Sequence, residues 1–365
     1  MRGTKSILDK NGFMSTQSPL GHTWARWFFF LGQWDIGKSY STTRQGIKWK
    51  MREITAGGKP TKFYIVFKNN ETMQDALSGD CMTLFDPDLV ERWITRAGYF
   101  LKRRGDLVFA CKAEYEINEK TGQTERTVIA TVPFCECIAL SNMPGDKELV
   151  KFDNRYRGRY VFCVNEINRE VRERDTFSLT YSFFRQLHTI CRDTKEDIYV
   201  FCCGNNAEDA SEILLSFNFI PLRYGKFTIK KRKCVIYNIE PTETVTRRMS
   251  GSLLDDVADT FNPASFTNEL KSDISLIYRG RLLKPKYRIQ FFKGNVYTVW
   301  DNGVVDESRG ENLPLRAMIP YQDAFYTKDI VQSVFDMYHA RAFRFRNLYI
   351  LRKFKKDLSL LKKHG

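Results

Sequence analysis

Residues 24–53 read WARWFFFLGQWDIGKSYSTTRQGIKWKMRE, and this stretch decides the fold. Its apolar start lacks alternation, which is typical of a strand covered on both faces, and a helix is expected from Lys38 onward. Between them, Gly32 to Ser39 (GQWDIGKS) fits the pattern G-x-x-x-x-G-K-[ST] in the strand-turn-helix setting that the pattern requires. The stretch therefore predicts a loop that binds nucleotide phosphates.

Each residue type in this loop has a physical reason. The glycines let backbone N–H groups wrap the phosphates, and the helix N-terminus adds its positive end. Lys38 can reach the β and γ phosphates of ATP, and the Ser39 hydroxyl can bind Mg²⁺. The alternative is a fortuitous match in an ordinary loop. The predicted nucleotide contacts are Gly32, Gly37, Lys38, Ser39 and Tyr40, with Lys38 also catalytic.

Further apolar runs predict an α/β fold with a mainly parallel sheet. Strands are expected at residues 62–68, 159–166 and 197–206, and helices at residues 177–191 and 208–217. Alternating strands and helices imply crossover connections between parallel strands.

Other segments depart from this alternation. Residues 86–103 are expected to be helical, because DPD at 86–88 supplies an N-cap followed by proline. The runs DLVFACKAEYEI and RTVIATVPFCECIAL flank the polar turn NEKTGQTE, which predicts a β-hairpin inserted between core strands. A second strand pair is expected at residues 226–240.

The length of 365 residues predicts about two domains. After residue 241 the chain becomes polar (TETVTRRMSGSLLDDVADTF), as in a linker or lid. We therefore predict a phosphate-loop domain at 1–241, a linker at 242–270 and a small α+β domain at 271–365. The last should hold three or four amphipathic strands and a helix running from about Thr327 into a basic tail.

Charge and cysteine content narrow the class of protein. The net charge of +15 predicts a polyanionic partner, nucleic acid before an anionic membrane. The nine cysteines are odd in number and lie mostly in apolar runs, which indicates a reducing intracellular compartment. Four scattered histidines give no metal-ligand spacing, so no zinc site is expected. We also expect no membrane span and no export signal.

A second site is expected where the run YVFCVNE ends. The Glu166 carboxylate is suited to polarising the attacking water, and we predict it to be catalytic. Asn165 stands where an Asp is usual, and its amide oxygen can accept from a metal-bound water without supplying charge. Mg²⁺ is thus expected at Ser39 and, through water, at Asn165. The alternative is a strand end with two polar residues.

Two further positions extend this site. Asn205 and Asn206 follow the next run, where an amide could sense the γ-phosphate or the water, and a turn-forming pair is the alternative. Arg192 lies where a ring-forming ATPase would present an arginine finger to the next subunit, while an Arg that interacts with the helix dipole or solvent is the alternative.

Two clusters mix basic and aromatic residues in a way that suits phosphate contacts. One is KFDNRYRGRY at 151–160, and the other is the C-terminus from residue 340. A solvated face, or for the C-terminus a helix on an anionic membrane, is the alternative. The predicted nucleic-acid contacts are Arg155, Arg157, Arg159, Arg341, Arg344, Arg346, Arg352, Lys353, Lys355 and Lys356.

In the order of these motifs the chain resembles the genome-packaging ATPases of small, short-tailed, protein-primed phages (the Picovirinae type). The resemblance covers GQWDIGKSY, KFYIVFK, the hairpin, VFCVNEI, FRQLHTICR before VFCCGN, TRRMSGSLLDD, FFKGNVYTVWDNG and the aromatic, basic C-terminus. It implies an additional-strand, conserved-glutamate (ASCE) P-loop ATPase that uses ATP and Mg²⁺ as a homo-oligomeric ring, a pentamer in this family. It also implies that a lysine, Lys147 or Lys151, acts from the neighbouring subunit.

The resemblance further implies a vestigial nuclease domain of RNase H-like fold from about residue 271. Expected partners are double-stranded DNA, the prohead or portal vertex and, as a further candidate, prohead RNA, with no membrane. The expected location is the host cytoplasm, transiently at the portal vertex.

The function that follows is ATP-driven translocation of double-stranded DNA into a viral prohead. One alternative is a helicase-like or recombination ATPase. Another is a non-enzymatic capsid or DNA-binding protein with a decayed nucleotide site, which Asn165 favours and the intact loop with Glu166 disfavours. An active nuclease in the C-terminal domain is a weaker hypothesis, because Asp273, Asp301 and Asp306 form no recognisable two-metal pattern.

Overall fold

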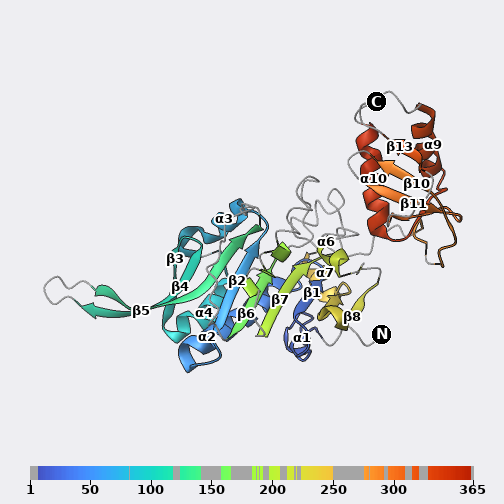
Figure 1. The fold of residues 1–365 in the computed structure, drawn as a ribbon. Helices are drawn as coiled ribbons and strands as arrows, with labels where there is room; N and C mark the ends of the chain where they lie inside the picture. Colours follow the sequence, from blue (N-terminus) through green and yellow to red (C-terminus); the bar gives the residue numbers. More distant parts are fainter. Residues whose placement is uncertain are drawn as a thin grey trace. The chain divides into compact units, whose positions relative to one another are not determined.

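A computed structural model of the chain describes two compact units, residues 1–270 and 271–365 (Figure 1). Each unit is treated by itself below. The described residues are 7–81, 83–117, 124–140, 158–165, 183–185, 187–188, 190–191, 197–205, 212–217, 219, 223–249, 275–278, 280–291, 295–308, 315–319 and 328–362.

The first unit is built on a nine-stranded sheet in the order β3-β4-β5-β2-β6-β7-β1-β9-β8 (Figure 1). Strands β5, β2, β6, β7, β1 and β9 pair in parallel, and β3, β4 and β8 are added antiparallel. This confirms the predicted mainly parallel α/β sheet. The strands are β1 (Trp27–Leu31), β2 (Thr61–Phe67), β3 (Tyr99–Arg104), β4 (Leu107–Ile117), β5 (Thr124–Ala139), β6 (Arg159–Val164), β7 (Asp197–Gly204), β8 (Gly225–Ile229) and β9 (Cys234–Asn238).

Helices cover both faces of this sheet, and β1 shows why its sequence does not alternate. Phe28 and Phe30 enter one core with residues of α2, whereas Phe29 and Leu31 enter a second core with residues of α6. All four side chains are 0% exposed, as expected for a strand covered on both faces. Helices with defined bounds among the described residues are α1 (Gln17–Leu20), α2 (Lys38–Ala56), α3 (Asn70–Cys81), α4 (Pro87–Trp93), α6 (Glu212–Ser216) and α7 (Glu243–Met249).

The predicted helix at 86–103 is wrong beyond Trp93. Its start is as expected, because Asp86 caps α4 by accepting a hydrogen bond from the backbone of Asp88. Gly98 then adopts a φ of +80° and ends a short 3₁₀ turn. The chain continues as β3, antiparallel to β4, because an extended ladder replaces the helix after this glycine.

The predicted β4–β5 hairpin is confirmed, and in the chain it is inserted between the core strands β2 and β6. It extends the sheet from the edge of β2, with β5 parallel to β2. Of the expected helix at 177–191, the described residues are helical. The predicted linker also differs in part, because α7 lies within it and buries Val245 (0% exposed) in the core.

The second unit contains a five-stranded sheet, β13-β10-β11-β12-β14, and its described residues include the helices α9 and α10. The helix expected from about Thr327 is present as α9, but its expected continuation into a basic tail is wrong, because Arg341 takes a φ of +55° after α9 and Phe343 and Phe345 are then buried. Phe345 adds the fifth strand, beyond the three or four expected. The elements are β10 (Pro285–Phe291), β11 (Val296–Trp300), β12 (Val304–Glu307), β13 (Leu315–Ile319), α9 (Lys328–His339), β14 (Arg344–Phe345) and α10 (Leu348–Lys362).

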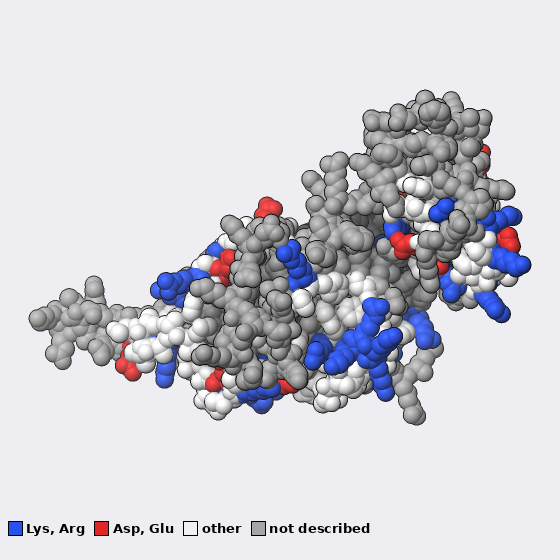
Figure 2. All heavy atoms as spheres, viewed as in Figure 1, with Lys and Arg blue, Asp and Glu red and all other residues white. Residues whose placement is uncertain are grey.

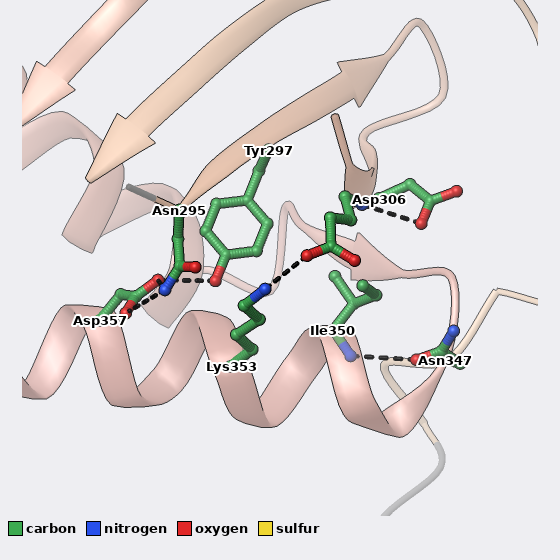
Figure 3. A network of polar contacts seen from close by, with 8 residues as sticks. Asn295, Tyr297, Asp306, Asn347, Ile350, Lys353 and Asp357 are labelled. Carbon is green, nitrogen blue, oxygen red and sulfur yellow. Dashed lines mark hydrogen bonds and ion pairs between the residues drawn. The ribbon is translucent and has the colours of Figure 1, made fainter. Parts of the chain in front are cut away.

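Polar contacts tie α10 to this sheet (Figure 3). The buried Asp357 carboxylate accepts hydrogen bonds from the Tyr297 hydroxyl at 2.6 Å and from Asn295 Nδ2 at 3.0 Å. One turn earlier, Lys353 forms an ion pair with Glu307 of β12. Within the described part of the chain, no helix combines the length and apolar character needed to span a membrane.

Candidate nucleotide-binding site

The predicted phosphate loop joins the carboxyl end of β1 to α2. Gly37, the residue before α2, has a φ of +82°, a conformation that favours glycine. The Gly32 N–H donates to the Gly204 carbonyl at the end of β7 (3.1 Å), which ties the loop to the neighbouring strand. The side chains of Gln33 and Ile36 are 1% and 0% exposed, so the loop is anchored from within.

Lys38 lies across this loop. Its Nζ donates to the backbone carbonyls of Gly32 (2.8 Å) and Gln33 (2.7 Å). The first turn of α2 has no acidic residue and no side-chain cap, and it exposes Ser39. A cation, a hydroxyl and the positive end of a helix thus lie together, which is the donor set that a polyphosphate needs.

Tyr40 has a structural partner outside the loop. Its hydroxyl donates to Asp88 Oδ2 at the start of α4 (2.9 Å). Burial, followed by this hydrogen bond, raises the pKa of Tyr40. The bond joins α2 to α4, and the nucleotide contact expected of Tyr40 stays a prediction.

Asn165 and Asn205 follow the carboxyl ends of β6 and β7. Because β7 pairs in parallel with both β1 and β6, Asn165 and Asn205 lie at the carboxyl ends of the strands, as the phosphate loop does. Strand β7 lies between β6 and β1. Asn165 Oδ1 is buried and accepts no hydrogen bond within the described protein. Leaving such an acceptor unsatisfied costs about 1–3 kcal/mol. The unmatched oxygen therefore fits a donor supplied by a ligand, such as a metal-bound water near Ser39.

Several predicted site residues lie outside the described residues, and their roles stay predictions. They are Lys147, Lys151, Arg155, Arg157, Glu166, Arg192 and Asn206.

Sequence reasoning missed an N-terminal turn that packs beside the loop. Asp9 Oδ1 accepts from the backbone N–H groups of Asn11 (2.8 Å) and Phe13 (3.0 Å), and the Met14 N–H donates to the Ile36 carbonyl (2.9 Å). Residues 8–13 and Thr244 line a pocket at this turn. The motif Asp-Lys-Asn-Gly at 9–12 is a turn signal, but nothing local places that turn against the loop.

A second unforeseen contact connects the loop to α7. Gln33 Oε1 accepts the backbone N–H of Thr242 (2.7 Å), one residue before that helix starts. Gln33 occupies an unspecified position of the motif, so the pattern gives no reason to expect a structural role there.

Buried thiols lie behind the loop, under the first turns of α2. Cys203 Sγ is 3.6 Å from Thr42 Oγ1, and burial raises the pKa of Cys203 to about 11. Burial likewise raises the pKa of Cys163 well above its usual range. Both thiols are therefore protonated at neutral pH and fill space as small apolar side chains.

The predicted nucleic-acid residues divide into two groups. Arg159 lies at the start of β6, at the sheet end opposite the loop, where its guanidinium stacks over the Trp49 ring at 4.2 Å. The Arg159 guanidinium thus already stacks on an aromatic ring of the protein itself, so its position is explained without a nucleic-acid partner. In the second unit, Arg341, Arg344, Arg346 and Lys355 are exposed.

The other basic residues predicted to contact nucleic acid all lie on α10, and the two with described side chains are less accessible. Arg352 and Lys353 are half-buried, and Lys353 pairs with Glu307. The side chain of Lys356 lies outside the described set. Phe354 and Leu358 on the same helix are buried in the unit, so the apolar face that membrane binding would use is already covered.

No protein-family model and no curated protein sequence matches the chain. Among solved structures, the Phi-28 gp11 DNA packaging motor aligns with a TM-score of 0.51 and 13% identity over 93% of this chain and 95% of that one. The bacteriophage Phi-29 viral genome packaging motor assembly aligns with a TM-score of 0.56 and 16% identity over 97% of this chain and 100% of that one. The fold therefore resembles that of phage DNA-packaging motor proteins along nearly the whole chain, as the sequence motifs predict.

Proposed function

We propose that this chain hydrolyses ATP and uses the energy to move double-stranded DNA into a viral prohead. The observation that carries the proposal is the phosphate loop between β1 and α2, with the unsatisfied Asn165 oxygen at the same sheet edge. The likeness of fold to two packaging-motor structures along nearly the whole chain supports it.

In this proposal Lys38 leaves its two loop carbonyls and neutralises the β and γ phosphates, and the N–H groups at the start of α2 hold the phosphate oxygens. Ser39 and Asn165 would hold Mg²⁺, which supplies positive charge beside the transferring phosphoryl group. Glu166 polarises the attacking water, and Asn205 holds that water or the γ-phosphate.

The proposal assigns the assembly roles by resemblance. The chains form a homo-oligomeric ring, a pentamer, in which Arg192 and either Lys147 or Lys151 act on the nucleotide of the next subunit. Residues 1–241, together with α7, form the ATPase domain, the rest of 242–270 forms the linker, and 271–365 form a vestigial nuclease-like domain that docks on the prohead or portal and touches DNA. Prohead RNA is a further candidate partner of that domain.

A DNA-stimulated ATPase assay tests the proposal directly. Lys38→Ala should abolish hydrolysis and weaken nucleotide binding, whereas Glu166→Gln should bind Mg²⁺·ATP without hydrolysing it. Wild-type turnover in Lys38→Ala would refute the loop assignment. Stimulation by DNA without prohead-dependent packaging would indicate the helicase-like alternative, and absence of any hydrolysis would indicate a decayed site.

Action between subunits needs a separate experiment. Arg192→Ala and Glu166→Gln chains, each inactive alone, are mixed under conditions where mixed rings form. If Arg192 serves the neighbouring site, some interfaces combine an intact Glu166 with an intact Arg192, and hydrolysis partly returns. A mixture that stays inactive would place Arg192 in its own subunit's site or in a structural role.

A further inference from the structure

The β8–β9 hairpin carries a concentration of positive charge that no predicted contact includes. Between residues 223 and 239 there are six basic residues and no acidic one, so this segment contributes +6 to the net charge of +15. All six side chains are exposed, and Figure 2 shows Lys and Arg gathered over this part of the molecule. We call these residues the hairpin cluster: Arg223, Lys226, Lys230, Lys231, Arg232 and Lys233.

No carboxylate neutralises this cluster within the described part of the chain. Arg223 and Lys226 lie over the Phe227 and Tyr237 rings, at 5.4 and 5.9 Å from the centroids. Elsewhere on the surface, exposed bases such as Lys59 and Arg96 do pair with acids. Uncompensated cations repel each other, so this concentration costs stability unless an anion binds there.

The cluster is held on a rigid part of the fold. Lys230, Lys231 and Arg232 form a single 3₁₀ turn that leads into β9, whose side chains are all buried. The backbone N–H groups of Arg26 and Trp27, at the start of β1, both donate to the Lys233 carbonyl (2.8 and 3.0 Å). A binding surface built on anchored strands loses little conformational entropy when it meets its ligand.

Protection of the sheet edge is the competing explanation, because lysines on an edge strand such as β8 discourage pairing between sheets. It accounts for Lys226, which lies within β8. It does not account for Lys230, Lys231 and Arg232, because they lie in the turn beyond the strand. The turn also lies at the amino end of β9, opposite the phosphate loop, so ATP bound at that loop is not its anion.

We propose that the hairpin cluster binds the phosphodiester backbone of duplex DNA, as a contact surface on the first unit separate from the C-terminal arginines. This inference rests on the proposed function for the identity of the polyanion. Because the proposed contacts are to phosphates and not to base edges, they carry no sequence information.

The test compares two charge-matched variants of the full chain. The first, Lys230→Gln/Lys231→Gln/Arg232→Gln, keeps Lys233 because its φ of +51° makes that position sensitive to substitution. The control, Lys102→Gln/Arg104→Gln/Lys112→Gln, removes the same charge from exposed positions on β3 and β4, the two strands at the far side of the sheet from β8. DNA binding is measured by fluorescence anisotropy with a labelled duplex across a range of KCl concentrations.

Removing one cation that touches a phosphate should reduce the slope of log K against log salt by about 0.9, so the slope of the hairpin variant should fall by about 0.9 to 2.7. At 0.1 M salt this corresponds to about an eightfold decrease in affinity for each such cation. The control should keep the wild-type slope. ATP hydrolysis without DNA should be unchanged in both variants, because neither set lies at the phosphate loop.

Equal decreases in both variants would overturn the inference, since net charge alone would explain them, and so would an unchanged slope in the hairpin variant. A decrease confined to duplex RNA of the same length would overturn the assignment to DNA. If the wild-type chain hydrolyses ATP and binds DNA while the hairpin variant binds equally well, only this inference fails. If the wild-type chain neither hydrolyses ATP nor binds DNA, the proposed function fails with it.

Discussion

Gly46 sets how closely α2, the helix that follows the phosphate loop, approaches β2. A Cβ at this position would lie 2.6 and 2.9 Å from Cζ and Cδ2 of Phe63, well inside the usual carbon contact distance of about 3.5–4.0 Å. The Phe63 ring cannot easily move aside, because the Phe85 and Phe134 rings pack against it with centroids at 6.3 and 6.2 Å.

Gly46→Ala should therefore destabilise the first unit although alanine favours helices. The propensity gain is about 0.8–1.0 kcal/mol, and overpacking of a filled core costs about 1–3 kcal/mol. With the ring confined, we expect the upper part of that cost and a net loss of about 1–2 kcal/mol. For a unit of this size that lowers Tm by about 2–8 °C.

Thermal and urea unfolding, followed by circular dichroism, measure the loss, and Phe63→Leu provides the control. In that background the ring is gone, so Gly46→Ala should be neutral or stabilising by up to about 1 kcal/mol. The argument is refuted if Gly46→Ala alone raises stability, or if its cost is the same with and without the Phe63 ring.

Three further measurements probe other parts of the fold. Tyr297→Phe removes the donor to Asp357 and should destabilise the second unit by about 1.5–3 kcal/mol in urea unfolding; a change near zero would mean that water replaces the bond. Burial is the main cause that raises the pKa of Glu136; Lys62 lowers this pKa and Asp106 raises it. Because the pKa is higher in the folded chain than in the unfolded chain, stability is lost as the pH rises from the unfolded-state pKa through the folded-state pKa. Glu136→Gln should therefore raise Tm relative to wild type at about pH 7 and not at about pH 4, and equal gains at both would contradict the assignment. Cys203, with its pKa raised to about 11, should resist alkylation at pH 8 in the native chain and react in urea, as read by mass spectrometry.

The parallel core was predictable because its strands are long enough and apolar enough to stand out locally. Phe28 to Leu31 form an unbroken apolar run, and the same pattern marks β2, β6 and β7. The helix expected through residue 103 failed because Tyr99–Arg104 reads YFLKRR, three apolar residues followed by three basic ones, and so lacks the alternation that marks a strand. Gly98 was the local signal for the break.

The loop itself was predictable for the same reason, since Gly37 and Lys38 act within one short segment. The contacts that sequence reasoning missed join residues far apart in the chain. Gln33 meets Thr242 across 209 positions, and Tyr40 meets Asp88 across 48. No local pattern encodes such pairs, because each depends on how the sheet brings separate segments to one edge.

The unsatisfied oxygen of Asn165 allows the nucleotide site to be tested through stability alone. If the amide serves a ligand and not the fold, then Asn165→Leu, which has nearly the same shape and no buried acceptor, should unfold at the same or a higher temperature than wild type without nucleotide. Mg²⁺ and a non-hydrolysable ATP analogue at about 100 times Kd should stabilise the wild-type chain by about 2.7 kcal/mol, and this gain should shrink or vanish in the variant.

Asn165→Asp is the matched control, because it keeps an acceptor and adds the charge that this position usually carries. It should lose stability without ligand, since a buried carboxylate lacks a partner there, and recover more than wild type when Mg²⁺ and nucleotide are added. A marked loss of ligand-free stability in Asn165→Leu would show that the amide holds the fold together, and the site would then lose its clearest sign of a missing ligand.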